Sequence, residues 1–78
     1  MISPIAMISQ EIVAQFQADA VEITTKSDSE TGEEYFLVVI KKQDIPDRDA
    51  MYADLRTFLR TYSLDLGRKF IPRVIQVA

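Results

Sequence analysis

The first part of the chain places apolar residues at the spacing of one helix face. Four of them recur every three or four residues, which is the period of an α-helix: Ile5, Ile8, Ile12 and Phe16. Ser3 offers a side-chain oxygen as N-cap, and Pro4 follows at the first helical position, where its missing N–H costs nothing. The pattern therefore predicts a helix over residues 4–18.

Two stretches with the two-residue period of β-strands follow. In residues 20–26, β-branched and polar side chains alternate, as in a strand that has one face in water. Residues 34–41 instead carry six consecutive apolar side chains, at positions 35–40, which is typical of a central strand covered on both faces. The turn-forming residues 27–32 between them predict a hairpin.

A second helix and a third strand complete the pattern. Six apolar side chains lie within one stripe of the second helix: Met51, Tyr52, Leu55, Phe58, Leu59 and Tyr62. This helix begins at Pro46 or just after Asp47, where an aspartate is available as cap, and it stops at Gly67. Residues 70–77 form the last strand, and Pro72 removes a backbone donor from it, so we expect it at an edge of the sheet.

These elements predict one compact α+β domain over residues 1–78, in the order α-β-β-α-β. The crossover through the second helix makes the second and third strands parallel. The central place of residues 34–41 favours a three-stranded mixed sheet ordered one, two, three. Two questions stay open: whether the third strand pairs instead with the first, and whether the two helices cover one face of the sheet or both.

The size of the chain favours association. A domain of 78 residues has a small core and buries only about 60% of the surface that its unfolded chain exposes. If both helices pack on one face of the sheet, either Tyr35, Leu37 and Val39 or the side chains that alternate with them stay open unless a second copy covers them. The other candidate surface for self-association is the charge-poor face of the first helix: Met7, Gln10, Ala14 and Gln17.

The chain contains no cysteine and no histidine. Disulfides, the usual zinc and iron sites, and nucleophiles activated by histidine are thereby excluded. We therefore expect no catalytic residue, no metal ion and no cofactor. An enzyme subunit whose site is completed by another chain is the least favoured alternative.

The acidic turn before the central strand has the wrong spacing for calcium. An EF-hand loop needs glycine at its sixth position and glutamate at its twelfth. A loop that began at Asp28 would place Gly32 fifth, and one that began at Ser27 would place Val38 twelfth. We interpret this turn as a solvated hairpin loop.

The two halves of the chain differ in charge. Residues 1–40 contain seven acidic residues and one basic residue, a net charge of −6, whereas residues 41–78 contain eight basic and five acidic residues, a net charge of +3. Convergence of the basic side chains would make a patch that binds anions or a partner: Lys41, Lys42, Arg56, Arg60, Arg68, Lys69 and Arg73. The overall charge of −3 disfavours nucleic acid, because nucleic-acid-binding domains are normally strongly basic.

The sequence predicts a small non-enzymatic interaction or regulatory protein that forms a homodimer or binds another protein. The alternative is a binder of nucleic acid or of an acidic partner through the basic C-terminal half. No stretch approaches the roughly 20 apolar residues of a membrane span, and no signal-peptide pattern opens the chain. We therefore expect a cytoplasmic protein without a membrane partner.

Overall fold

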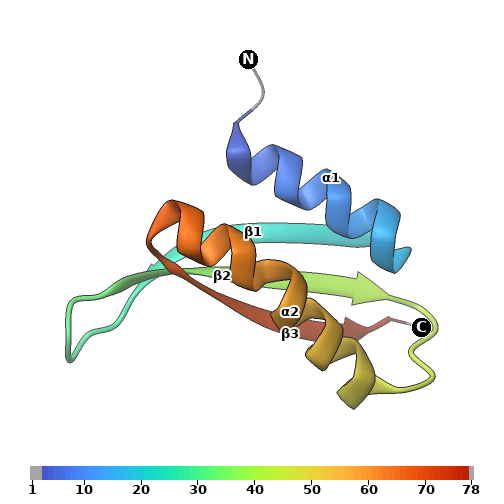
Figure 1. Ribbon diagram of the computed structural model, residues 1–78. Helices are drawn as coiled ribbons and strands as arrows, with labels where there is room; N and C mark the ends of the chain where they lie inside the picture. Colours follow the sequence, from blue (N-terminus) through green and yellow to red (C-terminus); the bar gives the residue numbers. More distant parts are fainter. Residues whose placement is uncertain (1–2, 78) are drawn as a thin grey trace.

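The computed structural model describes residues 3–77, which form two helices and a three-stranded mixed sheet (Figure 1). The helices are α1 (Pro4–Phe16) and α2 (Arg48–Leu66), and the strands are β1 (Ala20–Ser27), β2 (Glu34–Lys42) and β3 (Lys69–Gln76). The predicted α+β fold with the order α-β-β-α-β is confirmed.

The strand β2 lies in the middle of the sheet. It pairs with β1 antiparallel and with β3 parallel, so the order is β1-β2-β3. The third strand therefore pairs with the second and not with the first. Pro72 lies on the edge strand β3, opposite Val38, as the missing backbone donor required.

The helix ends follow local side-chain chemistry. The Asp47 carboxylate accepts a hydrogen bond from the Ala50 N–H at 3.1 Å, so α2 begins after Asp47 and not at Pro46. Gly67, with φ 67°, ends α2 in the left-handed conformation that glycine adopts without strain. The first helix ends two residues earlier than predicted, because Gln17 has φ 54° and ψ 42°, outside the right-handed helical region.

The acidic turn is the predicted hairpin loop. The carboxylate of Asp28 accepts hydrogen bonds from the N–H groups of Glu30, at 2.8 Å, and Thr31, at 3.4 Å. Gly32 takes φ 74°, which closes the loop before β2. The Asp28 carboxylate therefore serves the turn itself.

Both helices pack on the same face of the sheet. One core joins α1, α2 and this face through its buried side chains: Ile8, Ile12, Ala18, Val38, Ile40, Leu55, Leu59, Phe70 and Val74. The helices also contact one another, because the rings of Phe16 and Phe58 pack edge to face with their centres 5.9 Å apart. No element within residues 3–77 covers the other face of the sheet (Figure 1).

The outer edge of β3 lacks two of the backbone donors that a further strand would use. The Val74 N–H donates a hydrogen bond to the Tyr52 hydroxyl of α2 at 2.8 Å. Pro72, two residues earlier and on the same side of the strand, has no N–H to present. The middle of this edge is therefore poorly suited to pairing with a fourth strand.

We expect Tyr52→Phe to lower the free energy of unfolding by about 1–3 kcal/mol, because the buried Val74 N–H loses its acceptor. Tyr35→Phe is the matched control, since the Tyr35 hydroxyl makes no hydrogen bond within residues 3–77. Urea denaturation of dilute protein measures both changes. Equal losses in the two variants would contradict the role of the Tyr52 hydroxyl.

A second link between the helices depends on pH. The Tyr62 hydroxyl donates a hydrogen bond to the Glu11 carboxylate, and this bond raises the pKa of Tyr62 above its ordinary value of 10.0. Burial and the negative charges of Glu11 and Asp65 act in the same direction. Because the folded-state pKa is the higher one, the stability from this link is complete below about pH 10 and is lost as pH rises through the folded pKa.

We expect Tyr62→Phe to be less stable than the unmodified protein at pH 8, since the variant lacks the link to Glu11. Thermal denaturation between pH 7 and 11 should show this difference in melting temperature shrinking above about pH 10. A gap that stays constant to pH 11 would speak against the hydrogen bond as its source.

Candidate open sheet face

The face of the sheet that is turned away from the helices carries an apolar stripe along β2 and β3. We call it the open sheet face, and its apolar members are Tyr35, Leu37, Val39, Ile71 and Ile75. Ile71 and Ile75 expose 44% and 37% of their surface, and the three members on β2 are half-buried by the flanking strands. Within residues 3–77, this stripe joins apolar side chains of two adjacent strands on a face that no helix covers.

The strand register arranges the side chains of this face in rows that run from β1 across β2 to β3. Successive rows are Lys26, Tyr35 and Lys69; Thr24, Leu37 and Ile71; Glu22, Val39 and Arg73; and Ala20, Lys41 and Ile75. Charged side chains thus surround the apolar stripe. Basic residues outnumber acidic ones in these rows, although the chain as a whole carries a charge of −3.

The residues predicted for self-association divide between two surfaces. Tyr35, Leu37 and Val39 lie on the open sheet face. The other four are exposed and lie on α1 or, for Gln17, directly after it: Met7, Gln10, Ala14 and Gln17. The prediction omitted Ile71 and Ile75, although the alternation along β3 contained the signal that places them on the same face as Leu37.

The predicted basic residues do not form one patch. Lys41, Lys69 and Arg73 lie on the open sheet face. The ammonium of Lys42 donates to the Gln17 carbonyl at 3.2 Å and thereby links β2 to the end of α1. The remaining three, Arg56, Arg60 and Arg68, lie on α2 or directly after it.

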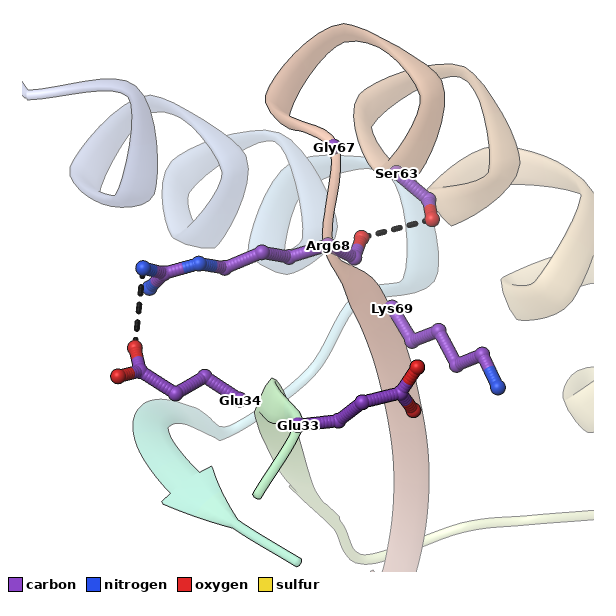
Figure 2. Close-up of a pocket in the computed structure, with 6 residues that line it drawn as sticks. All are labelled: Glu33, Glu34, Ser63, Gly67, Arg68 and Lys69. Carbon is purple, nitrogen blue, oxygen red and sulfur yellow. Dashed lines mark hydrogen bonds and ion pairs between the residues drawn. The ribbon is translucent and has the colours of Figure 1, made fainter. Parts of the chain in front are cut away.

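Arg68 belongs to a cavity of about 460 Å³ where β2 and β3 begin (Figure 2). Its guanidinium lies 2.9 Å from the Glu34 carboxylate and 5.6 Å from the centre of the Phe36 ring. Its carbonyl accepts a hydrogen bond from the Ser63 hydroxyl at 2.7 Å. Arg68 therefore holds the start of β3 against β2 and α2, and its charge is already neutralised by Glu34.

The same cavity is balanced in charge. Glu33 and Lys69 complete its lining, so two acidic and two basic side chains surround it. In Figure 2 the Glu33 side chain points toward Lys69, on the side opposite to the pair formed by Arg68 and Glu34. A cavity with this balance gives neither an anion nor a cation a clear preference.

A groove of about 260 Å³ between α2 and β3 has a different character. Arg56, Arg60 and Lys69 line it together with the exposed side chains of Leu64 and Ile71, and no acidic residue lies in its wall. Leu64 exposes 76% of its surface. The groove therefore combines positive charge with apolar contact area.

Two further features bear on chemistry. Among residues 3–77, no three acidic side chains lie close enough together to hold a metal ion. Neither of the described helices has the length and apolar content needed to cross a bilayer. Within residues 3–77, the candidate interaction surfaces are the open sheet face, the outer face of α1 and the groove beside β3.

Comparisons with known proteins give no match to a protein family, a curated protein or a solved structure. The function of this protein must therefore be inferred from its own surfaces.

Proposed function

We propose that this protein is a non-enzymatic interaction protein that forms a homodimer through the open sheet face. The observation that carries the proposal is the apolar stripe on β2 and β3, which lies uncovered because both helices occupy the opposite face. Apolar patches of this kind mark interaction sites in proteins that are otherwise well packed.

The size of this face sets the expected strength of the dimer. Three strands of eight or nine residues span roughly 400 Å² in projection, from the usual spacing of strands and residues. Stable protein interfaces bury about 800 Å² of accessible surface per partner. The dimer therefore falls among weak interfaces, and we expect a dissociation constant on the order of micromolar.

The open sheet face is a better interface than the outer face of α1. The α1 stripe has Met7 and Ala14 as its apolar members, and the other two positions of the predicted set are glutamines. The sheet face instead presents five apolar side chains on two adjacent strands, interrupted on β3 by Arg73. Continuous apolar area removed from water is the dominant driving force of association.

We expect Leu37→Lys to weaken the dimer at least tenfold, because a charge replaces the centre of the apolar stripe. Met7→Lys is the matched control, since Met7 exposes 48% of its surface on α1. Light scattering coupled to size exclusion, from about 1 to 100 micromolar, measures the mass of each variant, and circular dichroism checks the fold. An unmodified protein that stays a strict monomer would remove the self-association, and loss of the dimer in Met7→Lys alone would move it to α1.

We infer a second candidate function from the groove beside β3, namely the binding of an acidic protein segment that carries apolar residues. Its three basic side chains face no acid in the groove, and Leu64 and Ile71 supply apolar contact. Nucleic acid is the less favoured occupant, because the nearby Tyr52 ring already lies under Arg56, 5.8 Å from its guanidinium. Proteins that bind single-stranded nucleic acid without sequence preference use free aromatic rings on which the bases stack.

We expect the protein to bind a synthetic peptide of alternating Glu and Leu residues at low salt, and Arg56→Glu/Arg60→Glu to abolish that binding because it reverses the charge of the groove. Arg48→Glu is the control, since Arg48 is exposed on α2 outside the groove. Fluorescence anisotropy measures both. Retention on immobilised RNA without binding of the peptide would assign the groove to nucleic acid, and neither kind of binding would end this second proposal.

A further inference from the structure

We propose that the two copies meet with their twofold axis running across the strands at Leu37, so that β2 lies antiparallel over β2 of the second copy. The inference rests on the proposed self-association and adds its geometry. The observation behind it is the arrangement of charged residues on the open sheet face, in which opposite charges lie symmetrically about the row of Leu37.

Opposite charges lie at equal distances on either side of the row that contains Leu37. On β1, Glu22 and Lys26 lie two residues before and two residues after the residue paired with Leu37. Along β2 and the residue just before it, Glu33 and Lys41 lie four residues before and four residues after Leu37. These even spacings place all four charges on the same face as Leu37, because side chains alternate along a strand.

The position of Glu33 just before β2 is consistent with this alternation. Its carbonyl accepts a hydrogen bond from the Asp28 N–H at 2.8 Å, so the strand pairing continues to this residue. Figure 2 shows the side chains of Glu33 and Glu34 pointing in opposite directions, with Glu33 on the side of Lys69. Lys69 lies in the row of Tyr35 on the open sheet face.

A twofold axis that runs across the strands at Leu37 places each strand antiparallel over the same strand of the second copy. A residue before the Leu37 row therefore faces a residue that lies equally far after this row in the second copy. Glu22 then faces Lys26 of the second copy, and Glu33 faces Lys41 of the second copy. Each contact occurs twice, so the interface contains four pairs of opposite charge. At the centre, Leu37 packs against its own counterpart, and Tyr35 packs over Val39 of the second copy.

The competing arrangement, with the axis along the strands, places like charges together. It would set β1 over β3 of the second copy, which opposes Lys26 to Lys69. It would also set Lys41 against its own counterpart, and only Glu22 would find a basic partner, in Arg73. Opposed like charges cost free energy and exclude wrong arrangements, so the axis across the strands is favoured.

Strand β3 departs from the pattern. Lys69 and Arg73 lie two residues before and after Ile71, so the axis across the strands brings these two basic residues together twice. Four attractive pairs still outnumber two repulsive ones. The arrangement therefore has a net electrostatic gain beside the apolar contact at its centre.

Charge reversal on β1 tests the axis. Glu22→Lys and Lys26→Glu should each raise the dissociation constant roughly tenfold, because each turns two attractive pairs into repulsive ones at the cost typical of exposed charges. The double variant Glu22→Lys/Lys26→Glu should restore the affinity, since the pairs reform with their charges exchanged. Tighter association of Lys26→Glu would overturn the proposed axis, because that result requires Lys69 of the second copy as its neighbour.

Cross-linking provides a second test that does not depend on charge. The chain contains no cysteine, so each introduced thiol is unique. A bis-maleimide reagent that spans about 10 Å, the distance between packed sheets, should join a Tyr35→Cys chain to a Val39→Cys chain in a mixture. Neither variant alone should cross-link, because two copies of residue 35 would lie roughly 16 Å apart.

The outcomes separate this inference from the proposed function. A chain that stays monomeric in light scattering ends both. A dimer in which Tyr35→Cys cross-links readily to itself keeps the self-association and overturns the axis. A dimer that responds to none of the variants on the open sheet face overturns the axis and the choice of this face together.

Discussion

The contact between the two helices is the constraint on which the rest of this structure depends. Phe16 of α1 meets Phe58 of α2 edge to face, and the Tyr62 hydroxyl binds the Glu11 carboxylate one helical turn further along. Helices that touch one another must lie on the same side of a sheet only three strands wide. This contact therefore places the whole core on one face and leaves the other face to the solvent or to a partner.

That one-sided core explains why a strand as apolar as β2 has an uncovered face. Val38 and Ile40 are fully buried under the helices. Leu37 and Val39, which alternate with them along β2, point to the open sheet face and are half-buried. The same alternation sorts the charges, because the strand register carries Glu22, Lys26 and Lys41 to the side of Leu37. Apolar area and charge thus come to lie on one surface, and in the proposed dimer the apolar area supplies the affinity and the charges set the orientation.

Much of the fold was predictable because its signals are local. The caps at Ser3 and Asp47, the stop at Gly67 and the change from helical to strand period each depend on residues close together in the chain. The end of α1 at Gln17 was missed because glutamine has no intrinsic preference for a left-handed conformation. Whether the basic residues converge could not be judged from the sequence, because Arg68 pairs with Glu34 and Lys42 with the end of α1, and both contacts join distant parts of the chain.

The sequence alone determined the kinds, order and approximate limits of the elements, and with Pro72 it assigned β3 to an edge. Only the tertiary structure decided which face of β2 is covered. Both faces of β2 carry apolar side chains, so the sequence pattern does not indicate which of the two faces the helices cover. The decision comes from the packing of both helices on Val38 and Ile40, together with contacts between α1 and α2 whose partners are about 40 residues or more apart in the chain.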